Sequence, residues 1–280
     1  MAVRSRVNRD GGTKPRVRRA YFECRYGQLH VYNAMPAGGG FEEATTLLCL
    51  HETPLTGRMF AGALSLWGGD RSVYAPDLPG FGESEAPPSP PAIQDYAAAI
   101  GDFIDTMRFR KLDVLGSQTG ALVAAELAIS RPAQVRRVIL ASIPALTEAE
   151  RSQFLRAPWP TSPNEDGSYL MTEWRRAAAS AAQRVPLEVL ARRVAAMLNN
   201  GPQASWGMQA AAQYPFKERL RLMTQPVLVL RPRDEFWDAT ARARELLPSA
   251  RTVDFPNAGP GWYQAAPEAL VDATSTFLHG

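Results

Sequence analysis

The sequence contains few cysteines and histidines, which limits the metal and redox chemistry to consider. Only two cysteines, Cys24 and Cys49, and three histidines occur among 280 residues. Both cysteines fall in apolar, strand-like runs, where cysteine typically packs as a small buried hydrophobic residue. No C-x-x-C pattern or Cys/His cluster is present, so we expect no metal site and no cofactor. This cysteine usage is typical of a reducing compartment, and we expect a cytoplasmic location.

Long hydrophobic runs are also missing. No stretch of about 18 apolar residues occurs, which predicts no transmembrane helix, and the first 20 residues lack the apolar segment of a secretory signal. These residues carry seven Lys and Arg and one Asp, a charge of +6 within an overall +3, so the remainder is −3. We interpret 1–19 as a disordered, solvated basic leader. Contact with nucleic acid or an anionic surface is the alternative, but we expect neither nucleic acid nor a membrane as partner.

The body of the chain shows the pattern of an α/β protein. Apolar residues make up 45% of the sequence, enough to bury a sizeable core. Short apolar runs typical of strands alternate with longer stretches of helical periodicity. The predicted strands are 21–25, 29–32, 45–50, 72–75, 112–117, 138–141, 227–230 and 251–255. The predicted helices are 59–67, 93–107, 121–130, 239–247 and 267–278. This alternation predicts a mostly parallel central sheet flanked by helices.

Strand signals vanish between about 146 and 222. Predicted helices at 170–182, 187–198 and 202–213 occupy this stretch, which is rich in Ala, Arg and Leu. We therefore expect a core formed by 20–145 and 223–280, interrupted by a helical cap at 146–222.

The stretch 112–123 contains the central motif. It reads as a strand, a tight turn between Gly116 and Gly120, and a helix. This is the frame of a nucleophile elbow, G-x-S-x-G, whose middle residue sits on a strained strand-to-helix turn. The middle residue here is Gln118, whose amide is not a nucleophile.

Four stretches in order give the chain, over about 20–279, a resemblance to the α/β-hydrolase superfamily. His51 and Glu52 take the place of the H-G turn after the third strand. Residues 77–84 match D-x-P-G-x-G-x-S, 116–120 match the elbow, and 227–234 match the strand that supplies the catalytic acid. The resemblance implies an α/β-hydrolase fold with a helical cap over the active site.

The resemblance also implies where a catalytic triad would lie. The family order of nucleophile, acid and histidine falls on Gln118, Asp234 and a position near Pro260. No histidine lies near Pro260, since the three in the chain are His30, His51 and His279. Only the acid, Asp234, is retained, and the chain is identified as a member with a degenerate triad.

Ser117 is the alternative nucleophile. An elbow needs small residues two positions before and two after its centre, because the helix packs close to the strand. Gly116 and Gly120 satisfy this spacing around Gln118, whereas Ser117 would be flanked by Leu115 and Thr119. We therefore expect Ser117 to point away from the cleft, and a serine hydroxyl would also lack a base to take its proton.

The remaining groups favour oxygen binding and proton transfer. Backbone N–H groups of Thr53 and Thr119 would form the oxyanion hole. We expect Gln118, Asp234 and Glu52 to be the catalytic side chains. Asp234 would be a base or an arginine-paired structural carboxylate, and Glu52 a second cleft carboxylate or a solvated or arginine-paired one. The remaining predicted site residues are His51, with a structural or chemical role, and Trp262 and Tyr263, which line the pocket or pack in the core. Glu235 and Asp238 are expected to cap the following helix.

Three functions are compatible with this pattern. The first is a capped enzyme that binds a small, largely apolar substrate and performs lyase, cyclase, isomerase or atypical hydrolase chemistry without a serine. The second is a non-catalytic ligand-binding protein of hydrolase fold, favoured because both Gln118 and Pro260 depart from the triad. The third is an esterase with a displaced base such as His51. We favour the first slightly, because Asp234 and the turn glycines are intact.

Overall fold

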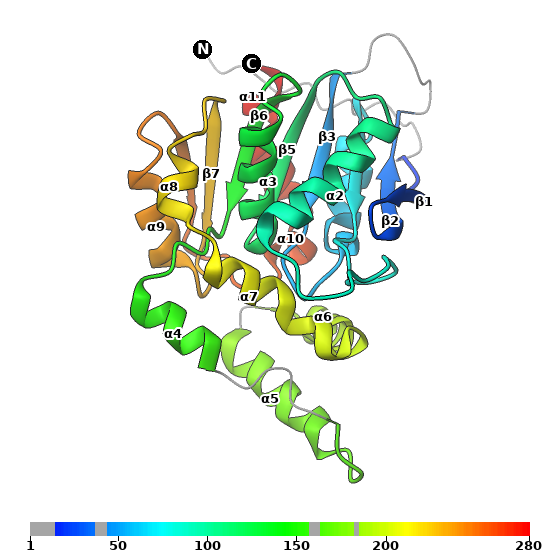
Figure 1. The fold of residues 1–280 in the computed structure, drawn as a ribbon, viewed down its shortest axis with the longest axis vertical. Coiled ribbons are helices and arrows are strands. Elements are labelled where there is room, and N and C mark those ends of the chain that lie inside the picture. Colours follow the sequence, from blue (N-terminus) through cyan, green and yellow to red (C-terminus); the bar gives the residue numbers. More distant parts are fainter. Residues whose placement is uncertain (1–14, 37–43, 157–162, 182–184) are drawn as a thin grey trace.

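An eight-stranded sheet forms the centre of the molecule (Figure 1). The computed structural model describes residues 15–36, 44–156, 163–181 and 185–280. The strand order is β1-β2-β4-β3-β5-β6-β7-β8. The strands are β1 (Arg18–Cys24), β2 (Gly27–Ala34), β3 (Ala44–Leu50), β4 (Arg71–Pro76), β5 (Leu112–Ser117), β6 (Val135–Ala141), β7 (Val227–Pro232) and β8 (Arg251–Phe255). Residues 1–14 of the expected leader lie outside the described residues, and β1 begins within the leader's predicted range.

Most neighbouring strands run in the same direction. β1 and β2 form an antiparallel hairpin, and β2 pairs antiparallel with β4. The pairs from β4 through β3, β5, β6 and β7 to β8 are all parallel. The predicted α/β-hydrolase fold with a mostly parallel sheet is therefore confirmed.

Helices cover both faces of the sheet (Figure 1). One face carries α1 (Ala61–Trp67), α10 (Trp262–Ala265) and α11 (Pro267–His279), and the other carries α2 (Ile93–Thr106), α3 (Thr119–Ser130), α8 (Phe216–Leu220) and α9 (Trp237–Glu245). The apolar stripe of α2 is buried, as its spacing predicts, with Ile93, Tyr96, Ile100 and Phe103 at most 1% exposed. Two buried clusters, one on each side of the sheet, form the core.

The segment between β6 and β7 forms only helices within its described residues. They are α4 (Glu148–Arg156), α5 (Ser168–Ala181), α6 (Leu187–Asn199), the short helices η2 (Gly201–Ser205) and α7 (Trp206–Gln213), and α8. α4 to α7 lie beyond the carboxyl ends of the parallel strands (Figure 1). In the described part of the chain, no helix has the length and hydropathy needed to cross a membrane.

The turn between β5 and α3 is tight and strained. Gln118 has φ 50° and ψ −116°, a positive φ that side-chain-bearing residues rarely adopt. Its backbone N–H donates to the Ala141 carbonyl oxygen at 2.9 Å, which ties the turn to β6. A Cβ at Gly116 would collide with the Gly120 carbonyl oxygen, and one at Gly120 would collide with that of Leu50. Both glycines are needed because α3 packs directly against β5 and the end of β3.

Substitution of Gly116 tests this packing. Gly116→Ala is expected to lower the free energy of unfolding by about 1–3 kcal/mol, the usual cost of overpacking a core, measured by urea denaturation. Gly69→Ala is the control, because a Cβ there meets only the Leu66 carbonyl oxygen at an ordinary 3.4 Å. Equal stability of the two variants would contradict this account of the turn.

Candidate functional site

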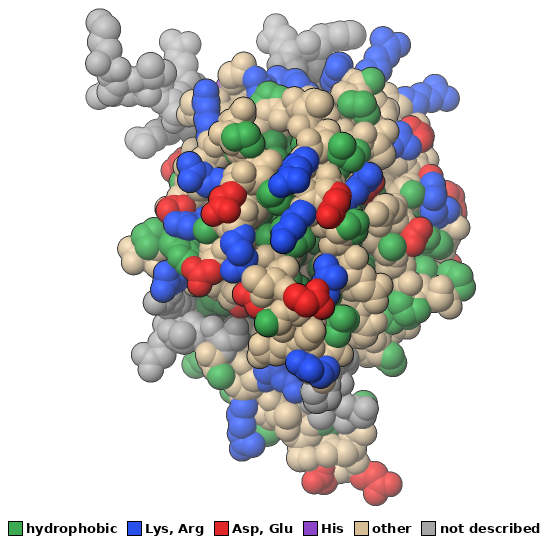
Figure 2. Space-filling model, turned by 60° about the vertical axis from the view of Figure 1, so that its left-hand side comes forward, with side chains coloured by type: hydrophobic (Ala, Val, Ile, Leu, Met, Phe, Trp, Pro, Cys, Tyr) green, Lys and Arg blue, Asp and Glu red, His purple; other side chains and the backbone are tan. Residues whose placement is uncertain are grey.

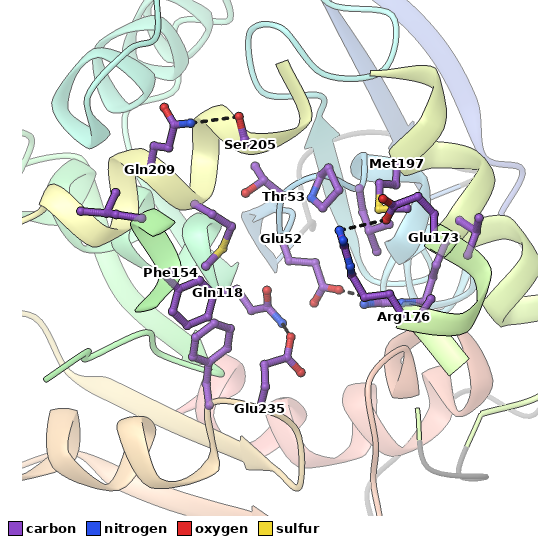
Figure 3. A pocket seen from close by; sticks show the side chains of 18 residues that line it. Glu52, Thr53, Gln118, Phe154, Glu173, Arg176, Met197, Ser205, Gln209 and Glu235 are labelled. Carbon is purple, nitrogen blue, oxygen red and sulfur yellow. Dashed lines mark hydrogen bonds and ion pairs between the residues drawn. The ribbon is translucent and has the colours of Figure 1, made fainter. Parts of the chain in front are cut away.

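A cavity of about 430 Å³ lies between the carboxyl ends of the central strands and helices α4 to α7 (Figure 3). Its polar lining consists of Glu52, Thr53, Gln118, Glu173, Arg176, Arg193, Ser205, Gln209 and Glu235. Its apolar lining consists of Pro54, Leu55, Phe154, Leu155, Ala177, Val194, Met197, Met208 and Phe236. The position agrees with the general rule that ligands bind at the carboxyl ends of strands in open α/β sheets. This combination of polar and apolar lining residues suits a small, mostly apolar ligand with a few polar groups.

Gln118 lies at the cavity floor and contacts a carboxylate. Its Nε2 donates to Glu235 Oε1 at 3.1 Å (Figure 3). Its side-chain oxygen accepts no hydrogen bond from the described residues. One N–H of the amide is therefore used, and its second N–H and its carbonyl oxygen have no partner among the described residues.

Glu235 belongs to the cavity, which corrects the expectation that it caps a helix. The residue next to α9 in the capping position is Phe236, and Glu235 lines the cavity instead. The residue is exposed to the solvent that reaches the cavity. Desolvation and the charge of Glu52 raise its pKa, while Arg193 and the Gln118 amide act in the opposite direction. A carboxyl group with a raised pKa is a stronger base than an ordinary glutamate and is suited to accept a proton.

Glu52 faces the same cavity and is paired with an arginine. Its Oε1 lies 2.6 Å from Arg193 Nη1, and its side chain is 4% exposed. Arg193 comes from α6 and is 18% exposed, so the ion pair joins the sheet to the helical segment. A second pair on the same wall joins Arg176 and Glu173 at 3.2 Å (Figure 3).

His51 holds two segments together and has no free nitrogen. Its Nε2 accepts from the Leu78 backbone N–H at 2.7 Å, so its Nδ1–H donates to the Glu52 carbonyl oxygen at 2.9 Å. The ring is fully buried, and desolvation lowers its pKa. These contacts assign His51 a neutral, structural state.

Thr53 and Thr119 lie side by side at the elbow. Their hydroxyls share a hydrogen bond of 2.8 Å. Within the described ranges, the backbone N–H of neither residue donates to another protein group. Gly207 on α7 allows this helix to approach, because a Cβ there would collide with the Thr53 side chain. Thr53 lines the cavity, whereas Thr119 is fully buried and lies outside its lining.

Asp234 lies next to the cavity but is not among its lining residues. Its Oδ2 accepts from the Ser142 hydroxyl at 2.5 Å, and its Oδ1 accepts from the Phe236 N–H at 2.9 Å. Desolvation, followed by the charge of Glu235, raises its pKa from 3.8 to about 7. Asp234 therefore readily holds a proton in the folded protein.

Ser117, Trp262 and Tyr263 also lie outside the cavity lining. Ser117 is fully buried, and its hydroxyl donates to the Tyr263 oxygen at 2.9 Å. Trp262 packs against the rings of Phe255 and Tyr263, each with centroids 4.6 Å apart. These three residues pack in the core beneath the cavity floor.

Several residues of this site were not predicted from the sequence. Glu235, Arg193, Arg176 and Glu173 line the cavity. Of these four, only Glu235 had a sequence feature that indicated the site, namely its position directly after Asp234. The three others lie on helices whose orientation over the sheet the sequence does not specify.

The pH dependence of stability tests the environment of Asp234. Its folded pKa of about 7 lies above the unfolded value near 3.8. The folded state therefore binds the proton more tightly, and this group's contribution to stability is lost as the pH rises between these values. The difference in the free energy of unfolding between Asp234→Asn and wild type is expected to favour the variant more at pH 8 than at pH 4, by about 1 kcal/mol or more. Urea denaturation at both pH values measures these free energies of unfolding.

The control for this substitution is Asp238→Asn on α9, which is exposed to solvent. A pH-dependent gain of the same size in that variant would contradict the assignment to Asp234.

Comparison with known proteins gives one matching family model. A model described as the alpha/beta hydrolase family matches residues 47–273. Among curated proteins, an uncharacterized hydrolase of Saccharomyces cerevisiae is 30% identical over 95 residues, 34% of this chain and 33% of that protein. The 2-hydroxymuconate semialdehyde hydrolase of a Pseudomonas species is 38% identical over 72 residues, 25% of each chain. Each match thus spans about a third or less of the relative's length.

Solved structures of similar fold cover nearly the whole chain. The enol-lactonase of Burkholderia xenovorans has a TM-score of 0.75 at 17% identity, covering 93% of this chain and 100% of that one. A thermophilic esterase of Thermogutta terrifontis has a TM-score of 0.74 at 18% identity, covering 94% and 98%. At these identities the likeness concerns the fold.

Proposed function

The chain belongs to the alpha/beta hydrolase family, and we propose that it performs proton transfer on a small carbonyl compound without a serine nucleophile. The observation that carries the proposal is the pairing of Gln118 with Glu235 at the elbow. The family's nucleophile position holds an amide, and the nearest reactive group in the cavity is the Glu235 carboxylate.

Glu235 is the proposed base. Its carboxylate removes a proton from the carbon next to a carbonyl group, or from an enol hydroxyl. Its raised pKa favours this role, because a base works best with a pKa near the operating pH. The Gln118 amide holds one carboxylate oxygen and leaves the other free for the substrate. Asp234, for which the sequence left open a base or a structural carboxylate, is not among the lining residues, and the proposal gives it no contact with the substrate.

The negative charge that develops on the substrate oxygen needs donors. In the proposal, the unpaired backbone N–H groups of Thr53 and Thr119 bind this oxygen. Return of the proton to another carbon gives an isomerase, and departure of a group gives a lyase. Both reactions use the same base and the same oxyanion site.

The helical segment provides the proposed cap. Side chains from α4, α5, α6 and α7 line the cavity together with the strand ends. Nine apolar residues line it, which favours a small and largely apolar substrate. The names of two similar proteins, an enol-lactonase and a semialdehyde hydrolase, support a carbonyl substrate.

A non-catalytic ligand-binding protein is the second candidate function. It is favoured by the replacement of two triad positions, since Gln118 stands at the elbow and Pro260 near the histidine position. An esterase with displaced residues is less compatible with the contacts. Ser117 donates to Tyr263 beneath the floor, and both ring nitrogens of His51 are occupied.

Proton exchange tests the role of Glu235 without knowledge of the product. A panel of small ketones, aldehydes and lactones is incubated with the protein in D₂O, and loss of the α-proton signal is followed by NMR. Wild type is expected to exchange at least one compound, and Glu235→Gln to be slower by about 100-fold or more. The rate should fall as the pH drops through the raised pKa of Glu235, because the protonated carboxyl group is no base.

The matched control for this test is Glu188→Gln, an exposed glutamate on α6 outside the cavity. Exchange that persists in Glu235→Gln would refute Glu235 as base. Binding of a compound without exchange would support the second candidate.

Labelling with a fluorophosphonate probe separates the proposal from serine chemistry. Such probes phosphonylate an activated serine hydroxyl. We expect no labelling of wild type by mass spectrometry, because the elbow residue is Gln118 and Ser117 contacts Tyr263 instead of the cavity. Labelling of wild type that disappears in Ser117→Ala would establish an esterase-like nucleophile.

A further inference from the structure

A second pocket lies at the end of the sheet opposite to the cavity. It has a volume of about 290 Å³. Arg137 lines it from β6, Arg251 from the first position of β8, and Phe277 from α11. These positions of β6 and β8 lie toward the amino ends of the strands, whereas the cavity above Gln118 lies at the carboxyl ends. The pocket is therefore separate from the site of the proposed function.

The lining of this pocket is positively charged. Arg137 and Arg251 belong to it, and no Asp or Glu side chain of the described residues does. Figure 2 shows several Lys and Arg side chains and few acidic ones at the end of the molecule opposite to helices α4 to α7. Gly280 also lines the pocket, and its carboxyl group forms no ion pair with either arginine among the described contacts. This distribution of charge favours an anion as ligand.

Arg137 is partly buried and has no acidic partner. Its guanidinium carbon lies 5.9 Å from the centroid of the Phe277 ring, which holds the group against α11. Its Nη1 is fully buried and has no hydrogen-bond acceptor among the described residues. A charged group that is partly withdrawn from water without a partner costs free energy. An anion in the pocket would offset this cost by neutralising the guanidinium.

The preceding residue of β6 shows how such a charge is compensated elsewhere in the sheet. Arg136 Nη2 lies 2.5 Å from Asp113 Oδ2, and its Nε donates to Oδ1 of the same carboxylate at 2.9 Å. Neither Arg137 nor Arg251 forms an ion pair of this kind with the described residues. Their charges are therefore available to a ligand.

Two hydroxyl groups complete the polar lining of the pocket. Ser249 precedes β8 and Thr276 lies in the last turn of α11, and neither hydroxyl donates to another described residue. A hydroxyl donates one hydrogen bond, and a guanidinium offers a planar pair of N–H groups. Donors that converge from three parts of the chain suit a phosphoryl group, which has three acceptor oxygens, better than a carboxylate, which has two.

We propose that this pocket binds a phosphoryl group, with Arg137 and Arg251 on its oxygens and the hydroxyls of Ser249 and Thr276 beside them. A phosphate monoester carries a charge of about −1.5 to −2 near pH 7, which two guanidinium groups neutralise. The planar fork of arginine pairs with phosphate in a bidentate manner. The pocket volume is near the lower end of the range of roughly 300–1,000 Å³ for small-molecule sites. It therefore holds a phosphoryl group together with part of a small molecule.

Titration with two probes tests the site. Inorganic phosphate and glycerol 1-phosphate are added at constant ionic strength, and the Kd is measured from ¹H–¹⁵N NMR shifts of the arginine side chains. Wild type is expected to bind at least one probe saturably. Arg137→Gln and Arg251→Gln should each raise the Kd by about tenfold or more, because each removes charge-assisted hydrogen bonds. Tighter binding of glycerol 1-phosphate identifies an ester as the ligand, whereas inorganic phosphate that binds at least as tightly identifies the free ion.

Two matched controls remove one arginine elsewhere. Arg244→Gln takes the same charge from an exposed position of α9 outside the pocket. An equal loss of affinity in this variant would show general attraction by the net charge and overturn the proposal. Arg176→Gln takes an arginine from the cavity. Loss of binding in Arg176→Gln, with binding retained in Arg251→Gln, would place the probe in the cavity instead.

The test does not depend on a single variant that folds. Arg251 and Ser249 are exposed, so Arg251→Gln and Ser249→Ala leave the core intact, and circular dichroism without phosphate checks that each variant is folded. Arg137→Lys keeps the charge but loses the planar fork, so its Kd should lie between those of wild type and Arg137→Gln. Failure of wild type to bind either probe refutes the site, including the case in which the Gly280 carboxylate occupies the arginines in solution. Acetate that binds as tightly as phosphate refutes the choice of a phosphoryl group.

Discussion

The close approach of α3 to β5 and β3 is the constraint on which the site depends. It is possible only because Gly116 and Gly120 have no side chains where the helix meets the sheet. The approach forces Gln118 into a positive φ and directs its side chain to the cavity floor. It also leaves the first N–H groups of α3 without partners, as at any helix start. The strained strand-to-helix turn of a nucleophile elbow is thus present with glutamine at its centre.

The segment before α11 contains no histidine, and its aromatic residues pack in the core. Trp262 and Tyr263 begin α10, and the Tyr263 hydroxyl accepts a hydrogen bond from Ser117 at the elbow at 2.9 Å. A phenol is neutral at pH 7 even when exposed, and burial raises the pKa of Tyr263 further, so this hydroxyl is no base. The proposed function therefore assigns the role of base to a carboxyl group.

The sequence predicted the sheet and its flanking helices because their signals are local. Buried strands are short apolar runs, and a stripe such as that of α2 repeats at helical spacing. The elbow was predicted from the spacing of Gly116 and Gly120. This spacing is a local signal too, because the close approach of α3 to the sheet leaves no room for a Cβ at either position. Glu235 was missed because neighbouring residues point to opposite sides in a strand. After β7 the chain turns instead, with the Asp234 N–H donating to the Pro232 carbonyl oxygen, and both carboxyl groups face one region.

Three carboxyl groups, of Glu52, Asp234 and Glu235, lie in one small region, where each negative charge disfavours ionisation of its neighbours. The three carboxyl groups have different surroundings. Arg193 pairs with Glu52, burial raises the pKa of Asp234, and Glu235 lines the cavity and accepts from the neutral Gln118 amide. Glu235 combines access to the cavity with a raised pKa and has no arginine ion pair among the described contacts. These properties support the proposed role of Glu235 as the base, because a general base has to reach the substrate and accept its proton.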